Sequence, residues 1–361
     1  MTTILALPET SRRSLPRPSA ALIWLTLVLA VAYVAVPLFA SRYVIEALLL
    51  PFLALSLAAV GLNLLTGYAG QLSLGSAAFM AVGAFAAYNF NLRLGFLPLP
   101  VSFVLAGLTA ALVGVVFGLP SLRLRGFYLA VSTLAAQFFV QWALSKFGWF
   151  SNNNPSGVIS VPRLQLAGFS LDTPTGRYLF SLTIVTLLSL FVWRLTRSAS
   201  GRAFLAVRDG ETAARAIGIP VPQTKLLAFA VSSFVIGVAG ALWAFTYLRT
   251  VEPAGFNLDR SFQILFMVII GGLATIRGAF LGAAFIVIFP LLLARAGAFL
   301  FGGIFDSGVL DMTQRIVIGA LVILFLIAEP RGLAALLDRI GARLSATAAR
   351  LAGSSSPSPR S

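Results

Sequence analysis

Residues 197–225 have the sequence RSASGRAFLAVRDGETAARAIGIPVPQTK, and the interpretation of the whole chain starts from them. This stretch contains four arginines and one lysine against only Asp209 and Glu211. Apolar segments of membrane-spanning length lie on both sides of it. Membrane proteins keep long basic segments on the cytoplasmic side. The stretch is therefore predicted to be a cytoplasmic segment between two transmembrane helices.

Two short helices joined by a turn are predicted within this cytoplasmic segment. Asp209 and Gly210 favour a turn, and Asp209 can cap the helix that follows. Glu211 then lies in the first turn, where the helix dipole favours an anion. Gly218 and Pro220 are placed to end the helix. Two interpretations stay open here: a solvated loop that obeys the positive-inside rule, or a docking helix for a soluble partner.

The composition places the chain in a membrane and excludes several classes of function. Its 361 residues are 59% hydrophobic and 10% charged, which no water-soluble globular domain matches. The net charge is +15, and the charged residues lie in short breaks between apolar runs. The orientation of a membrane protein explains this distribution better than nucleic-acid binding does. Without Cys or His the chain offers no thiolate metal site and lacks the commonest catalytic base, so we expect no metal and no cofactor.

ATP is not expected to bind to this chain. Its two lysines, Lys146 and Lys225, both lie outside any GK[ST] motif, so it has no phosphate-binding loop. If ATP drives the protein, another subunit must bind the ATP.

The apolar runs predict an all-α, polytopic transmembrane bundle of about ten spans. The spans are residues 20–40, 45–66, 76–92, 99–119, 126–145, 177–194, 226–248, 262–275, 279–298 and 313–330. The eighth is short for a span, which suggests a tilted, broken or re-entrant segment. A cleaved signal peptide is the alternative for the first run, but its length favours a span.

The basic residues orient this transmembrane domain, residues 20–330. Most of the 26 basic residues fall in cytoplasmic segments when the N-terminus is inside. Residues 1–19 are then a disordered cytoplasmic tail, residues 195–225 a cytoplasmic loop, and residues 331–361 a basic, Ser/Pro-rich cytoplasmic tail. Residues 146–176 form the longest outside loop, which is rich in turn-forming residues. The loop is either an ordinary connector or a contact for a receptor. Its candidate receptor-facing residues are Asn152, Asn153, Asn154 and Gly157.

Uncharged polar residues provide the candidates for a substrate path. Glu46 and Glu329 lie at span ends, so the chain lacks the mid-membrane carboxylate that a proton-coupled carrier usually needs. Residues 67–75, GYAGQLSLG, interrupt the apolar pattern with glycines that permit unwound backbone or close helix packing. Packing is the alternative to substrate contact at each position, although discontinuous helices are common in transporters. The candidates are Asn63, Gln71, Ser73, Ser76, Gln137 and Gln141.

Four motifs, spread over most of the chain, carry a resemblance to a known family. They are GLNLLTGYAGQLSLGSAAFMAVGAFAA (61–87), LRLRGFYLAVSTLA (122–135), GRAFLAVRDGETAARAIGI (201–219) and ILFMVIIGGLATIRGAFLGAAF (264–285). In this order they resemble the permease subunits of branched-chain amino acid ABC importers, specifically the larger, M-type subunit. The chain departs from the family at Ser76, where His is frequent, and in SNNNPSGVISVP (151–162), where a TGGSDG-like sequence is usual.

The resemblance implies an ABC importer permease fold in the bacterial cytoplasmic (inner) membrane. It implies three kinds of partner: a second permease subunit, two ATPase subunits and an extracytoplasmic substrate-binding protein. It also implies that an EAA-like motif in the cytoplasmic loop inserts into a cleft on the ATPase. That role falls on Arg202, Arg208, Asp209, Glu211, Ala213, Ala214 and Gly218. Because a helix this short is marginal alone, we expect its partner to order residues 210–217.

The leading hypothesis is thus a transport subunit without enzymatic activity of its own. Branched-chain amino acids are the expected substrate, with urea, short amides or other amino acids as the alternatives within the same class. A stand-alone secondary carrier or channel is the alternative from a different class, and a membrane enzyme is the third. The long basic loop and the missing mid-membrane carboxylate weigh against the carrier.

Overall fold

The computed structural model describes two stretches of the chain. The first is residues 26–301, except residues 96, 125, 155–157, 162–163 and 167–168. The second comprises residues 316–317, 319–320, 323, 327 and 332–339. The predicted tail 1–19, Gly157, Glu329, most of the span 313–330 and most of the tail 331–361 lie outside the described residues.

The chain divides into two units, Met1–Ser41 and Arg42–Ser361. In the first unit, η1 (Val31–Ala35) and α2 (Val36–Phe39) belong to the apolar helix Thr26–Phe39. The second unit begins with one continuous helix, made of α3 (Arg42–Val44), η2 (Ile45–Leu49), α4 (Leu50–Asn63) and η3 (Leu64–Tyr68). Its remaining helices are α5 (Ser76–Arg93), α6 (Leu99–Gly118), η4 (Leu119–Leu122), α7 (Phe127–Lys146), α8 (Pro174–Arg197), α9 (Ala199–Asp209), α10 (Glu211–Ala216), α11 (Val221–Leu242), η5 (Trp243–Leu248), η6 (Pro253–Phe256), α12 (Leu258–Gly271) and α13 (Ile276–Phe301).

Strands are short within the described part of the chain. β1 (Ile159–Ser160) pairs antiparallel with β4 (Thr250–Val251), with Ile159 opposite Val251. β2 (Gln165–Leu166) pairs antiparallel with β3 (Phe169–Ser170). The predicted all-α class is therefore confirmed.

Among the described residues, five helices are long and apolar enough to cross a membrane. They are Arg42–Tyr68, Leu99–Leu122, Phe127–Lys146, Pro174–Arg197 and Val221–Leu248, which match five of the predicted spans. This confirms a multi-pass helical membrane protein. The total of ten spans stays a prediction.

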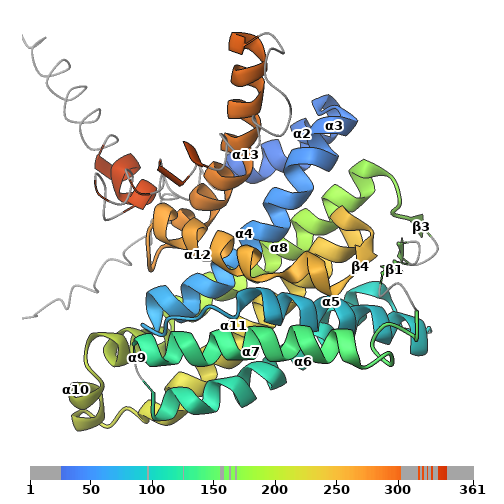
Figure 1. Ribbon diagram of the computed structural model, residues 1–361. Helices are drawn as coiled ribbons and strands as arrows, with labels where there is room; N and C mark the ends of the chain where they lie inside the picture. Colours follow the sequence, from blue (N-terminus) through green and yellow to red (C-terminus); the bar gives the residue numbers. More distant parts are fainter. Residues whose placement is uncertain are drawn as a thin grey trace, which may run out of the picture. The chain divides into compact units, whose positions relative to one another are not determined.

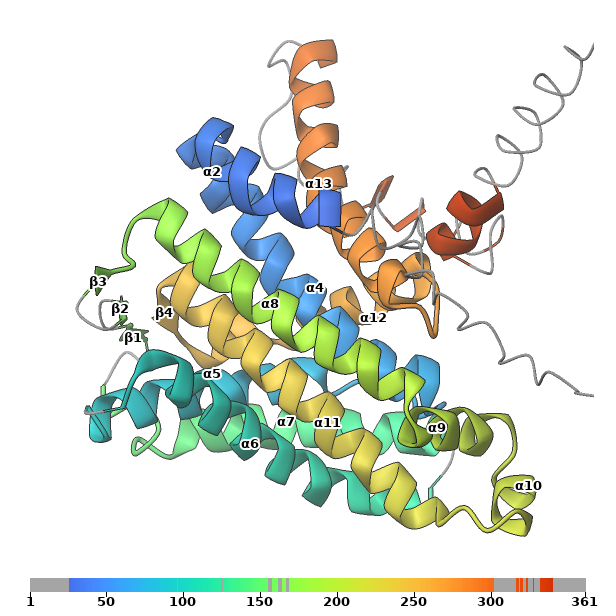
Figure 2. The same ribbon diagram turned by 180° about the vertical axis from the view of Figure 1, so that it is seen from behind.

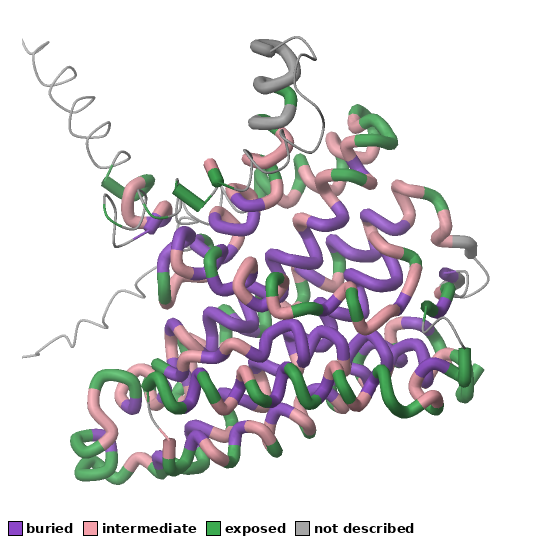
Figure 3. Tube along the Cα trace, viewed as in Figure 1, coloured by how far each residue is buried: buried purple, intermediate pink, exposed green. Residues whose placement is uncertain are grey.

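The helices α4 and α11 form the interior of the second unit. α11 packs against α4, α5 and α6 (Figures 1 and 2). The most apolar window of Arg42–Tyr68 is 83% buried and that of Val221–Leu248 is 72% buried, whereas that of Pro174–Arg197 is only 28% buried. Figure 3 shows the same contrast between the interior and the outer helices. The outer helices thus present apolar side chains that lipid or another subunit can cover.

Small residues let the interior helices touch backbone to backbone. A Cβ atom at Gly240 of α11 would overlap the carbonyl oxygen of Met80 in α5. A Cβ atom at Gly83 of α5 would overlap the carbonyl oxygen of Gly237 in α11. Only glycine permits so close an approach at these positions.

The eighth predicted span differs from expectation in its bounds. Helix α12 covers Leu258–Gly271 rather than residues 262–275, and its 14 residues extend about 21 Å, short of a hydrocarbon core of about 30 Å. Gly272 follows with a φ of +113° and Ala274 has a φ of +58°, so the backbone turns before α13 begins at Ile276. The segment is therefore broken between α12 and α13 rather than a continuous span.

The two loops that contain candidate functional residues, 195–225 and 146–176, lie at opposite ends of the second unit. Helices α9 and α10 extend beyond one end of the bundle, and strands β1–β4 gather at the other (Figures 1 and 2). The helix Val221–Leu248 runs between them, from just after α10 to just before β4. The loops 195–225 and 146–176 are thus separated by the length of a membrane-spanning helix.

Candidate functional site

The predicted pair of short helices in residues 197–225 is confirmed as α9 and α10. The turn between them lies at Gly210, as expected, but the N-terminus of α10 has no side-chain cap. Asp209 instead accepts from the adjacent guanidinium of Arg208, so the predicted capping role of Asp209 is wrong. Gly218 ends the segment with a φ of +85°, the left-handed conformation that favours glycine after a helix.

A small apolar core within the chain holds the two helices together. Ala214 of α10 packs with Val207 of α9 and Val221 of α11. Ala214 is only 1% exposed, so it faces this core and offers no surface to a partner. The expectation that a partner orders residues 210–217 overlooks this packing, because the segment has an apolar contact of its own.

A buried ion pair fixes α10 to the membrane helices. The carboxylate of Glu211 lies 2.6 Å from the ammonium of Lys225, with only 17% and 5% of the two side chains exposed. The Lys225 ammonium also donates to the carbonyl of Ser121 at 3.1 Å. Glu211 therefore points towards Lys225 in its own chain, and its predicted contact with an ATPase stays a prediction. The pair links α10 to the start of α11 and to η4.

Helix α9 is fixed to the end of η3 and packs against the turn that follows it. The guanidinium of Arg208 donates to the carbonyl of Gly67 at 3.0 Å. Gly70 has a φ of +67°, and a Cβ atom there would lie 2.6 Å from Cγ of Arg208. Glycine thus fits this turn for its conformation and for the close approach of Arg208. Arg202, another predicted docking residue, donates to the carbonyl of Arg197 and is exposed.

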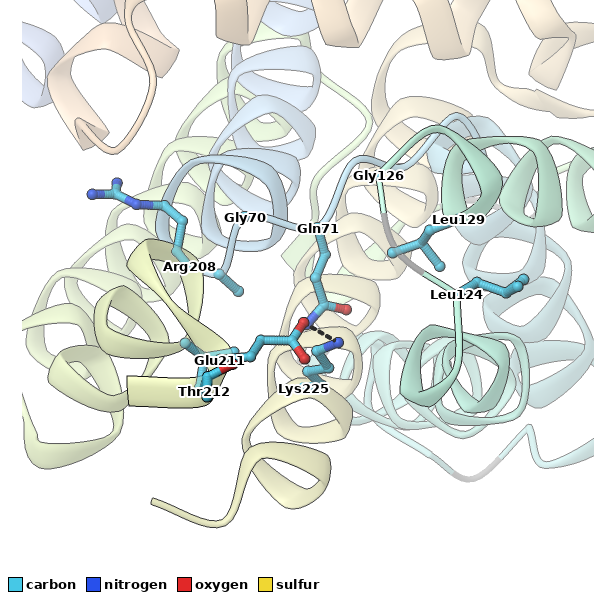
Figure 4. Close-up of a pocket in the computed structure, with 11 residues that line it drawn as sticks. Gly70, Gln71, Leu124, Gly126, Leu129, Arg208, Glu211, Thr212 and Lys225 are labelled. Atoms are coloured by element: carbon cyan, nitrogen blue, oxygen red, sulfur yellow. Dashed lines mark ion pairs between the residues drawn. The ribbon is translucent and has the colours of Figure 1, made fainter. Parts of the chain in front are cut away.

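A partly open cavity of about 160 Å³, here called the inner cavity, lies between these elements. Residues 69–71, the start of α7, helices α9 and α10 and the start of α11 contribute to its wall (Figure 4). The amide of Gln71 points towards the Glu211–Lys225 pair in this view. Gln71 is 3% exposed, and neither its Nε2 nor its Oε1 has a hydrogen-bond partner among the described residues.

The glycine-rich segment that contains Gln71 is unwound, as the sequence suggests. Residues 69–75 are non-helical and lead to α5. The first N–H groups of α5 have no partner within the helix, and side chains of other helices bind two of them. Ala78 donates to Oε1 of Gln137 at 2.6 Å, and Ala77 donates to Oγ of Ser261 at 2.9 Å. Because Gln137 lies in the middle of α7, α5 begins halfway along the bundle.

The side chains of two predicted path residues, Gln137 and Asn63, form hydrogen bonds to backbone groups of neighbouring segments instead of facing an open path. The amide of Gln137 also donates to the carbonyl of Phe256 at 2.8 Å, and the residue is 1% exposed. Asn63 donates to the carbonyl of Thr275 at 2.8 Å and accepts from the N–H of Ala274 at 2.9 Å. Asn63 thereby fixes the turn between α12 and α13. In this structure both amides are engaged, so substrate contact at either stays a prediction that competes with this packing role.

The other predicted path residues differ in their exposure and in their contacts. Ser73 accepts from the N–H of Gly75 at 3.3 Å, close to the start of α5. Ser76 is fully buried, and its hydroxyl has no partner among the described residues. Gln141 lies one turn beyond Gln137 and is half-buried. Gln71 lines the inner cavity, apart from these.

The outer loop forms turns, as predicted. Asn152 and Asn153 have φ values of +53° and +56°, a conformation that asparagine tolerates better than most residues. Asn154 donates from its side chain to the carbonyl of Val158 at 2.8 Å. All three asparagines are exposed.

Sequence reasoning missed an ion pair with a buried arginine, formed between the starts of two predicted spans. Arg177 of α8 is 4% exposed, donates to the carbonyl of Thr246 at 2.9 Å and pairs with Glu46 at 2.5 Å. Glu46 and Arg177 each lie at the outer start of a predicted span. The sequence did contain one indication of this pair, because the two opposite charges lie at the same predicted depth in the membrane.

Comparison with known proteins places the chain among transport permeases. Residues 44–326 match the model of a family described as "Branched-chain amino acid transport system / permease component". The chain is 32% identical over 333 residues to the high-affinity branched-chain amino acid transport system permease protein LivM of Escherichia coli, covering 85% of this chain and 73% of the relative. LivM of Salmonella typhimurium is 31% identical over 335 residues, with the same coverage. A probable LivM of Methanocaldococcus jannaschii is 26% identical over 196 residues, which are 54% of this chain and 55% of that protein.

Proposed function

Because the chain belongs to the family of permease components of branched-chain amino acid transport systems, we propose that it forms, with a second permease subunit, the membrane path of an ABC importer for branched-chain amino acids. It lies in the bacterial cytoplasmic membrane with both termini inside. One observation carries this proposal beyond family membership. The segment α9–α10 extends beyond the bundle yet is tied to it by the Glu211–Lys225 pair and by Arg208.

The exposed face of α10 is the proposed contact with the ATPase subunits, which bind and hydrolyse ATP. Apart from Ala214 and the partly buried Glu211, the residues of α10 are exposed, and Ile217, just after the helix, is 74% exposed. Ile217 can supply an apolar anchor and Arg215 a charge at the rim, the two components of a typical protein interface. Glu211 and Ala214 support this face from within, and Gly218 ends the helix beneath it.

At the opposite end, the turns at Asn152–Asn154 are the proposed contact for an extracytoplasmic substrate-binding protein. Asparagine side chains at exposed turns can donate and accept hydrogen bonds without the desolvation cost of a charge. The distance between the two ends lets each soluble partner bind without hindering the other.

Reconstitution of the complete transporter tests the function. Proteoliposomes that contain this chain, a second permease, two ATPases and the binding protein are expected to accumulate labelled leucine only when ATP is supplied. Urea and a sugar serve as competing substrates in parallel assays. Uptake of sugar alone would overturn the substrate class, and ATP-independent leucine flux through this chain alone would favour a carrier or channel.

The proposed orientation makes a separate prediction. Topology reporters fused at Asn153 and at Ser354 should lie on opposite sides of the membrane, because the charge bias puts the first outside and the second inside. An alkaline phosphatase fusion should be active only at Asn153, and a fluorescent protein only at Ser354. Reporters on the same side at both positions would contradict the five spans predicted between them.

A further inference from the structure

The wall of the inner cavity has two chemically different sides. One side carries the Glu211–Lys225 ion pair and the amide of Gln71. The other includes the aliphatic side chains of Leu124, Leu129 and Val207. The cavity measures about 160 Å³, whereas about 10–15 Å³ suffices for one water molecule. It therefore has room for a small organic molecule that is polar at one end and aliphatic at the other.

The amide of Gln71 is the strongest indication that this cavity takes a ligand. A buried amide that lacks partners is unfavourable, and most buried polar atoms in proteins are hydrogen-bonded. In Gln71 both amide atoms lack a partner among the described residues, although one is a donor and the other an acceptor. A ligand that satisfies both must itself carry an acceptor and a donor close together.

An α-amino acid carries this combination. Its carboxylate can accept from Nε2 of Gln71 while lying beside the Lys225 ammonium. Its ammonium group can donate to Oε1 of Gln71 while lying beside the Glu211 carboxylate. The zwitterion then lies antiparallel to the ion pair, so the four charges alternate in sign and the pair need not separate. An aliphatic side chain would extend towards Leu124 and Leu129.

We propose that the inner cavity is a binding site for a zwitterionic aliphatic amino acid that arrives from the cytoplasm. The proposal rests on the proposed function, because that function places α9 and α10 on the cytoplasmic side. A bound amino acid would bridge Glu211 of α10 and Gln71, in addition to the bond that Arg208 of α9 makes to Gly67 of η3. Restraint of α10 would slow the movement by which the ATPases drive transport. The site thus makes the transporter sensitive to its own product.

Proteoliposomes with the ATPase subunits facing outwards test this site. Substrate-loaded binding protein is enclosed inside, and ATP with or without free leucine is added outside. We expect leucine at about 1 mM to lower the ATPase rate at least about twofold, since such sites for small polar ligands are weak. Gln71→Leu should raise the leucine concentration needed at least about tenfold, because it removes both hydrogen bonds that Gln71 makes to the ligand. Gln223→Leu, an exposed position near the start of α11, is the matched control and should keep the wild-type sensitivity.

Leucine analogues test the recognition of both charges without any substitution. Leucine methyl ester lacks the carboxylate and 4-methylpentanoate lacks the ammonium group, so both should inhibit far less than leucine. Equal inhibition by either analogue would overturn recognition of a zwitterion, whether or not Gln71→Leu folds. An ATPase rate that external leucine does not change would overturn the site itself. Absence of any stimulation by the enclosed binding protein, before leucine is added, would instead contradict the proposed function.

Discussion

Glu211→Lys should abolish uptake while leaving the permease inserted in the membrane. The substitution replaces an attraction by two ammonium groups in contact with each other, in a place where only 5% of the Lys225 side chain is exposed. Breaking a buried ion pair from one side costs about 3–5 kcal/mol, enough to detach a six-residue helix from its support. We expect normal permease abundance, loss of ATPase co-purification and loss of labelled leucine uptake.

The charge-swapped double variant Glu211→Lys/Lys225→Glu is the matched control for this experiment. It restores an ion pair between α10 and α11, although the hydrogen bond from Lys225 to the Ser121 carbonyl is lost. Partial recovery of ATPase binding and uptake is therefore expected. If Glu211→Lys alone retains a bound ATPase and a wild-type uptake rate, the pair does not hold the coupling segment and residues 197–225 are a simple cytoplasmic connector.

Gln137→Leu should destabilise the whole bundle rather than change its substrate. Leucine has nearly the same size, but it takes the Gln137 amide away from the N–H of Ala78 and the carbonyl of Phe256, and it leaves the Ser261 hydroxyl without its acceptor. Each buried polar group left unpaired costs about 1–3 kcal/mol. The variant should unfold at a clearly lower temperature in detergent and accumulate at a lower level in cells.

Gln141→Leu, one helical turn away, separates this explanation from a general sensitivity of α7. Gln141 is only half-buried, so its replacement should change the unfolding temperature little. A Gln137→Leu variant that keeps full thermal stability but loses uptake would instead show that Gln137 binds the substrate.

Local patterns predicted the elements of this protein well because their physical causes are local. The turn at Gly210 and the glycine at Gly218 follow from backbone preferences of neighbouring residues, and both are present. The unwound segment at residues 69–75 likewise follows from its closely spaced glycines and polar residues. In each case the residues that decide the structure are within a few positions of one another.

The direction in which a side chain points was not predictable in the same way. Ala214 and Glu211 were expected at a partner's surface, but α10 turns both towards its own chain because Val207, Val221 and Lys225 converge there. A six-residue helix is too short for its apolar pattern to show which face is buried. Glu46 and Arg177 are 131 positions apart, so their pairing depends on the packing of helices rather than on any local motif.

The backbone contact between α5 and α11 restricts how this protein can change shape. Because Gly240 meets Met80 and Gly83 meets Gly237 without intervening side chains, neither helix can slide or rotate against the other without a steric clash. The two helices must therefore travel as a single rigid body in any cycle of inward and outward opening. The required flexibility is left to the unwound residues 69–75 and to the turn at Gly272–Thr275. The helix that precedes the first hinge is bonded to α9 through Arg208 and Gly67, and Asn63 of the same helix holds the turn at Ala274 and Thr275. A force applied at the cytoplasmic end can therefore reach both hinges through that helix.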